Sequence, residues 1–414
     1  MIKHALVSAS VALAFAFAAP AHAAGPTNAV RCSEGGDPNA TIAACTKAIG
    51  SGTLNKVDKA RSLHNRALAH ARLKQYSPAI ADLTQAIEID PKNGEHHLTR
   101  GEISMLSGRY PQAVADIEDG IRIAGPAMRS EYLLGIAQTG NHDLKAAIAA
   151  FTAALKFAPR EIAILNRRAN VYFDTRDYDR ALADYTQALA IDPKNALLYY
   201  NRAEVWRFTH DLTRARQDLD EAVRLDPKNE NIYFRRGLVR IEAHTYPEAL
   251  ADFDKALQID PHSPAILMHR GIARFFAGRF KDAEADLVAS AAAGPQNPYS
   301  VLWLYIVRRH QGKNAAADLR AQAKNLDLAL FPGPLVSFYL GDIKANSPLL
   351  ATKGDSDQDR KERLCETSFY LGEEALLRGD RKAAGDYFRR TVATGLHYIM
   401  EYQGAAVELQ RMGL

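Results

Sequence analysis

Prolines recur along this chain at a fixed step, and that period limits the possible folds more than any other feature. The step is 34 residues from Pro159 through Pro193, Pro227 and Pro261 to Pro295, and Pro91 lies two such steps before Pro159. An internal period of roughly 20–50 residues is the signature of a repeat array. Because proline stops a helix and forces the next turn, each interval predicts a helical unit that ends at its proline.

Small and bulky residues return at fixed places within each interval. A small residue stands midway through the first predicted helix, at Ala67, Gly101, Gly135, Ala169, Ala203, Gly237 and Gly271. An alanine and, four residues later, a bulky residue mark the second helix, as in Ala147 and Phe151. Small residues let two antiparallel helices approach closely, and the bulky residues fill the space between successive pairs. The pattern therefore predicts an all-α chain of stacked helix pairs.

A 34-residue helix-turn-helix unit with this pattern resembles the tetratricopeptide repeat family, over seven consecutive units at residues 60–297. The resemblance implies a right-handed α-solenoid whose first helices line a concave groove for a protein or peptide. Carrying over the groove positions of the family, we expect a partner at Tyr132, Asn166, Asn170, Phe173, Tyr200, Arg207, Phe208, Phe234, Met268, Phe275 and Phe276. An alternative is left open, in which the chain's own C-terminal segment covers several of these aromatic residues.

The family's carboxylate clamp is only partly present. Asn170, Asn201 and Arg235 stand at three of its five positions, whereas Asn166 and Asn231 replace its two lysines. Charged donors supply most carboxylate recognition, so the loss of both cations argues against a working clamp.

Weaker units extend the array at both ends. The C-terminal third, through VLWLYI, FPGPLVSFYLG, CETSFYLGEEALLRGD and EYQGAAVELQRM, is similar to periplasmic tetratricopeptide proteins of the NlpI lipoprotein type. The predicted organisation is a cleaved signal peptide (1–23), an N-terminal cap with a degenerate first repeat (24–59), seven repeats (60–297), an eighth degenerate pair (298–325), an irregular connection (326–364), and a terminal repeat with a C-terminal helix (365–414).

An arginine and an aspartate recur together in six of the seven repeats, always sixteen residues apart. The third repeat loses both at once and has Leu134 and Ala150 instead. A charge on a packing face is costly unless it is paired, and the planar guanidinium suits a carboxylate. We therefore expect structural ion pairs across each hairpin at Arg66–Asp82, Arg100–Asp116, Arg168–Asp184, Arg202–Asp218, Arg236–Asp252 and Arg270–Asp286.

The first residues predict export. The basic start MIKH, an apolar run and Ala21-His22-Ala23 form the pattern of a cleaved secretory signal, and the style of this leader indicates the periplasm. In an exported chain Cys32 and Cys45 are expected to form a disulfide, while Cys365 is left as a buried thiol.

Composition and motifs argue against catalysis. The chain is 47% hydrophobic and 24% charged, which is typical of a folded protein. Its net charge of +4 is too small to indicate binding to nucleic acid. It has no nucleophile elbow, HExxH, P-loop or CxxC motif. We therefore expect no enzyme activity, no cofactor, no metal and no membrane insertion after leader cleavage. The predicted function is a periplasmic adaptor that binds a peptide or helix of an envelope protein in its groove. The NlpI-type resemblance implies that this partner is an envelope protease or a cell-wall enzyme. The alternative is an assembly factor of a secretion or envelope complex, which binds through its convex face or its ends.

Overall fold

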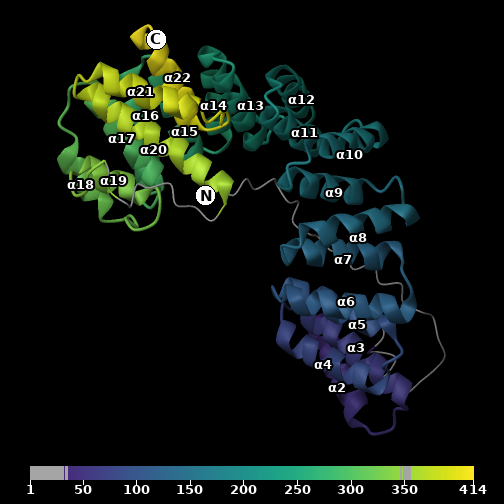
Figure 1. The fold of residues 1–414 in the computed structure, drawn as a ribbon. Coiled ribbons are helices and arrows are strands. Elements are labelled where there is room, and N and C mark those ends of the chain that lie inside the picture. The colour runs from purple at the N-terminus through teal and green to yellow at the C-terminus, as the bar shows by residue number, and fades with distance from the viewer. Residues whose placement is uncertain (1–31, 33–35, 346, 348–355) are drawn as a thin grey trace. The chain divides into compact units, whose positions relative to one another are not determined.

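The computed structural model describes residues 32, 36–345, 347 and 356–414 (Figure 1). The predicted leader at residues 1–23 lies outside the described residues. Those that are described form 21 α-helices and no β-strand, which confirms the predicted all-α class and its tandem helix pairs. Within this part of the chain, no helix is both long enough and apolar enough to cross a membrane. The chain divides into two compact units, Met1–Pro193 and Lys194–Leu414, each of which is described by itself.

The first unit begins with a single helix and continues with four helix pairs. Its helices are α2 (Pro38–Gly50), α3 (Lys56–Arg72), α4 (Tyr76–Ile89), α5 (Gly94–Leu106), α6 (Tyr110–Ala124), α7 (Met128–Gly140), α8 (Leu144–Phe157), α9 (Ile162–Asp174) and α10 (Tyr178–Ile191). The single helix α2 packs on α3 in the place of a second helix of an incomplete pair.

The second unit continues the same alternation of first and second helices and ends in three C-terminal helices, α20 to α22. Its helices are α11 (Ala196–Phe208), α12 (Leu212–Leu225), α13 (Glu230–Glu242), α14 (Tyr246–Ile259), α15 (Pro264–Phe276), α16 (Phe280–Ala293), α17 (Pro298–His310), α18 (Ala316–Ala323), α19 (Gly333–Tyr339), α20 (Asp357–Leu377), α21 (Arg381–Val392) and α22 (Met400–Met412).

The terminal repeat begins earlier than the sequence interpretation placed it. Residues 357–364 belong to α20 rather than to the irregular connection. Ser356 Oγ accepts a hydrogen bond from the backbone of Asp359, and the Asp359 carboxylate accepts one from the backbone of Ser356. This reciprocal capping box satisfies two backbone groups at the start of the helix, so the acidic run starts a helix instead of forming a loop.

Each helix pair closes where a small residue meets a bulky one. A Cβ atom at Gly135 would lie 2.5 Å from the Phe151 ring, and one at Gly237 would lie 2.6 Å from the Phe253 ring. Both rings are almost completely buried. The close approach of the two helices therefore depends on the missing side chain at this position.

The turn inside each pair places one residue in the left-handed region, where L side chains are strained. Four pairs have glycine there, at Gly108, Gly278, Gly312 and Gly379. Five repeats tolerate a side chain at the same place, with positive φ at Lys74, His142, Arg176, His210 and His244.

The first helices of successive repeats form one row within each unit. Direct contacts join α5 to α7 in the first unit, and α13 to α15 and α15 to α17 in the second. We call the surface carried by this row the first-helix face: α3, α5, α7 and α9 in the first unit, and α11, α13, α15 and α17 in the second (Figure 1).

Candidate functional site

The six arginines of the repeat pattern form bidentate ion pairs with aspartates of their own hairpins. In the first unit, Arg168 Nε donates to Asp184 Oδ2 and Nη2 to Oδ1, both at 2.8 Å. The same fork joins the other five pairs at Arg66–Asp82, Arg100–Asp116, Arg202–Asp218, Arg236–Asp252 and Arg270–Asp286. In the third repeat, apolar side chains stand at both positions of the pair, with Ala150 buried and Leu134 half-buried.

A further bond of these arginines was missed in the sequence. Arg168 Nη1 donates to Thr152 Oγ1 at 3.0 Å, and Arg100 Nη1 donates to Thr84 Oγ1 at 3.1 Å. For two arginines of the second unit the acceptor is a carboxylate, with Arg236 bonded to Asp220 at 2.8 Å and Arg270 bonded to Asp254 at 2.7 Å. Each acceptor lies on the second helix of the preceding repeat, so the arginine bridges two repeats. The signal was present for five of the six, because a threonine or aspartate stands sixteen residues before each later arginine, whereas Arg66 bonds Thr46, twenty residues before it.

On the first-helix face of the first unit, the predicted groove residues lie on α7 and α9. Arg167 Nε donates to Tyr132 Oη at 2.8 Å, and the guanidinium carbon lies 5.7 Å from the centre of the Tyr132 ring. Asn170 Oδ1 accepts a hydrogen bond from Tyr185 Oη. Phe173 is buried and its ring lies 5.8 Å from that of Tyr178. Asn166 is half-buried on the same helix as Asn170.

The same face of α3, α5 and α7 carries polar contacts that the sequence did not indicate. His64 Nδ1 and His96 Nδ1 lie 2.9 Å apart, and burial lowers the pKa of His64 to about 3. Arg129 donates to Glu95 at 2.7 Å and to Glu102 at 2.8 Å. These polar residues of α3, α5 and α7 therefore pair with one another.

In the second unit the C-terminal segment covers part of the first-helix face, which resolves the alternative left open by the sequence. Arg207 Nη2 donates to the backbone carbonyl of Tyr398 at 3.0 Å. The rings of Phe208 and Tyr398 lie 4.5 Å apart, and those of His210 and His397 lie 4.1 Å apart. The turn between α21 and α22 thus lies against α11, where a partner was expected.

Phe275 and Phe276 are also covered by the chain itself. Arg411, from α22, donates to their backbone carbonyls at 2.8 and 3.1 Å. Both rings contact Trp303, which is 1% exposed and packs in turn on Phe369. These residues therefore belong to the core between the repeats and α20–α22.

The remaining groove residues of the second unit are buried or half-buried within it. Phe234 packs edge-on against His269, and Asn297 Nδ2 lies 3.8 Å from Met268 Sδ. Tyr200 Oη accepts a hydrogen bond from Arg235 Nε at 2.9 Å. Arg235 also pairs with Glu204 at 3.1 Å, so this arginine of the partial clamp is already neutralised.

Buried carboxyl groups gather where α17 meets α20 and α22. His310 Nε2 lies 2.8 Å from Glu373 Oε2, and Glu408, which pairs with Arg411, completes a group of metal-ligand type within 4.8 Å. Two cationic side chains face two carboxylates here, so the cluster balances its charge without a metal ion.

Beside that cluster, Tyr299 Oη donates to Glu366 Oε2 at 2.8 Å, and Tyr370 Oη donates to Glu401 Oε1 at 2.8 Å. Burial, together with the neighbouring Glu401, raises the pKa of Glu366 to about 8.

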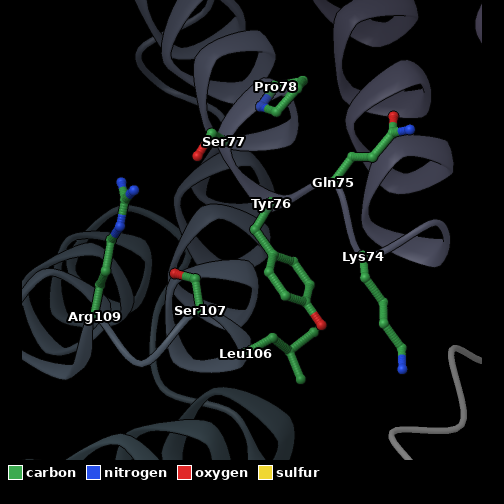
Figure 2. Close-up of a pocket in the computed structure, with 8 residues that line it drawn as sticks. All are labelled: Lys74, Gln75, Tyr76, Ser77, Pro78, Leu106, Ser107 and Arg109. Carbon is green, nitrogen blue, oxygen red and sulfur yellow. The ribbon is translucent and has the colours of Figure 1, made fainter.

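Near the N-terminal end, the sulfur atoms of Cys32 and Cys45 lie at bonding distance, 2.10 Å apart, and Cys365 is a buried thiol. A surface pocket occupies a different place, where the turn before α4 meets the turn before α6 (Figure 2). It is lined by Lys74, Gln75, Tyr76, Ser77, Pro78, Leu106, Ser107 and Arg109, and it contains none of the predicted groove residues.

Known proteins support the interpretation of the repeats. Sequence profiles described as tetratricopeptide repeat match residues 60–93, 162–195, 200–264 and 240–300.

Among solved structures, the chain is similar to a tetratricopeptide repeat protein from Parabacteroides merdae (18% identity, 60% of this chain and 98% of that one, TM-score 0.49). It is also similar to PilF from Pseudomonas aeruginosa (14%, 51% and 96%, 0.43). A third similar structure is YrrB, described as a tetratricopeptide protein with an unusual peptide-binding site (19%, 45% and 94%, 0.40). From the profile matches and the helix pairs described above, the chain contains tandem tetratricopeptide repeats.

Proposed function

We propose that this chain is a non-enzymatic adaptor that binds an extended segment of a partner protein on the first-helix face of its first unit. Tetratricopeptide arrays are generally scaffolds for protein–protein interaction, and their first helices provide the binding surface. The periplasmic location, the leader at residues 1–23 and the NlpI-type kinship remain parts of this proposal.

One observation carries it: the first-helix face of the second unit already holds a non-helical segment, the turn between α21 and α22, through these kinds of contact. The Arg207 side chain binds the backbone carbonyl of Tyr398, and Phe208 packs on the Tyr398 ring. A side-chain donor to the main chain and an aromatic platform are the two elements by which a helical groove holds an extended peptide. In the first unit, Tyr132 on α7 offers the aromatic ring, and the side-chain amide of Asn170 on α9 offers the donor.

Photo-crosslinking tests the proposal against the assembly alternative. A benzoylphenylalanine replaces Tyr132 on the first-helix face or, as the matched control, Phe157, an aromatic residue of α8 that is 53% exposed. In cells that produce the full chain, we expect one partner protein to crosslink from position 132 and not from position 157. The crosslink should disappear when Asn170→Ala is added.

The opposite pattern, with crosslinks from position 157 alone, would favour an assembly factor that binds through its outer helices. Equal crosslinking from both positions, or none from position 132, would contradict binding on the first-helix face.

A further inference from the structure

The two units contain the same tyrosine–arginine pair in different electrostatic surroundings. Arg167 Nε donates to Tyr132 Oη at 2.8 Å, and Arg235 Nε donates to Tyr200 Oη at 2.9 Å. The second pair lies 68 residues, or two repeats, after the first. The pairs are therefore equivalent by repeat position, and their neighbours can be compared one by one.

In the second unit the pair belongs to a neutral, buried network. Arg235 pairs with Glu204 at 3.1 Å, and Arg207 pairs with both Glu204, at 3.5 Å, and Glu242. The two carboxylates balance the two guanidinium groups. Glu204, Arg207 and Glu242 are each at most 3% exposed, so this balance is what allows the charges to be buried.

In the first unit two of these charges are missing. The positions of Glu204 and Arg207 are taken by Ile136 and Thr139, whereas those of Arg235 and Glu242 keep their charges as Arg167 and Asp174. No described residue forms an ion pair with either Arg167 or Asp174. Arg167 is half-buried, and Asp174, the last residue of α9, is exposed and open to a ligand. The first unit thus keeps one cation and one anion whose counter-charges its sequence does not supply.

The distance between Arg167 and Asp174 sets the distance that two opposite charges on a ligand must have. They are seven residues apart on α9, which at the rise of an α-helix is a separation of about 10 Å. An extended segment of polyproline II type advances about 9 Å in three residues and returns to the same face. A carboxylate and a cation three residues apart in such a segment can therefore reach Arg167 and Asp174 together.

We propose that the first-helix face of α7 and α9 selects a partner segment that carries a carboxylate and, three residues away, a basic side chain. The carboxylate pairs with Arg167, which Tyr132 holds in place, and the basic side chain pairs with Asp174. Asn170, whose Oδ1 accepts from Tyr185, donates its amide to the main chain of the segment. The inference rests on the proposed function, and it adds the charge pattern of the partner.

Three capped synthetic peptides test this charge pattern on the full chain. The first is acetyl-Ala-Pro-Glu-Ala-Pro-Lys-Pro-Ala-amide, the second exchanges Glu and Lys, and the third has Gln at both positions. Fluorescence anisotropy of labelled peptides measures binding. We expect one of the two charged peptides to bind at least about tenfold more tightly than the Gln peptide, which corresponds to about 1.4 kcal/mol.

Variants separate this site from general charge effects. Arg167→Gln should remove the preference for the charged peptide, Arg167→Lys should restore part of it, and Arg160→Gln, at an exposed arginine just before α9, should leave it unchanged. Exchange of the charges, by Arg167→Glu with Asp174→Lys, should transfer the preference to the other charged peptide. Circular dichroism verifies that each variant is folded.

The outcomes distinguish this inference from the proposed function. Equal affinity for all three peptides, or no binding of any, would overturn the charge pattern. The proposed function would still stand if position 132 crosslinks a partner, and it would fall separately if that crosslink is absent. Retained preference in Arg167→Gln would also overturn the inference, because the selectivity would then come from another part of the chain.

Discussion

The ion pair between Arg168 and Asp184 offers the sharpest energetic test of the repeat architecture. The Arg168 side chain is 17% exposed and that of Asp184 is 7% exposed, so both charges lie largely out of water. Arg168→Leu would leave the Asp184 carboxylate without either of its two guanidinium bonds. Breaking a buried pair by removing one partner costs about 3–5 kcal/mol. We expect about 3 kcal/mol for Arg168→Leu, since part of the arginine remains exposed.

The double variant gives the decisive comparison. Arg168→Leu with Asp184→Ala installs the combination that the third repeat already carries as Leu134 and Ala150. We expect Asp184→Ala alone to cost about 2 kcal/mol, because the long arginine side chain can move toward water. The double variant should lose no more than about 3 kcal/mol rather than the sum of about 5, a coupling of about 2 kcal/mol.

Urea unfolding followed by circular dichroism measures the total loss of stability. Hydrogen exchange of α9 and α10 assigns that loss to the correct hairpin, because a repeat array need not unfold in one step. The reasoning fails if the two single losses simply add. It also fails if neither single change costs more than about 1 kcal/mol, which is the value of an exposed pair.

Three other perturbations have defined outcomes. Cys32→Ser with Cys45→Ser should destabilise α2 by about 3 kcal/mol if the two sulfurs are bonded, and the hydrogen exchange of α2 with and without reductant measures it. Burial raises the pKa of Glu366 to about 8. Burial also disfavours the His310 cation, but the bond to Glu373 outweighs this effect and raises the pKa of that histidine. The folded second unit therefore holds protons that the unfolded chain would already have released at the same pH, so its stability decreases as the pH rises. We expect its melting temperature to fall from pH 6.5 to pH 8.5, and to fall less steeply in Glu366→Gln. A melting temperature that does not change with pH would contradict this. Lys74→Gly, at a positive φ of 58°, should raise the urea midpoint by the equivalent of up to about 1 kcal/mol, whereas a lower midpoint would show that the lysine is not strained there.

The repeat pattern was sufficient to predict the helix pairs, because proline, small and bulky positions act within one hairpin. Contacts with a part of the chain that is distant in sequence could not be predicted in this way. The position of Phe208 predicted a surface residue, and only the packing of Tyr398, 190 residues later in the chain, shows that it is covered. The start of α20 was missed because its acidic and basic residues resemble a solvated loop, whereas the Ser356–Asp359 cap is a local feature that the sequence did contain.

For the candidate site, residue types could be predicted but not their partners. Tyr132 and Asn170 were expected on the groove from their repeat positions. The role of Arg167 was not predicted, because it follows only from a comparison with Arg235. Arg235 pairs with Glu204, whereas the position equivalent to Glu204 in the first unit is Ile136. That comparison requires knowing which side chains meet between adjacent repeats, and repeat position alone does not give this.

The third bond of each arginine has a consequence for how the first unit comes apart. By bridging to the preceding repeat, it links neighbouring hairpins in addition to closing its own, and it thereby strengthens the nearest-neighbour coupling of the array. At Leu134 this link is absent, and the boundary between the α5–α6 and α7–α8 repeats is instead bridged by Arg129 of α7, which pairs with Glu95 and Glu102 of α5. The coupling there therefore depends on one exposed arginine, so its loss should let the first unit separate at this boundary into two linked folding blocks.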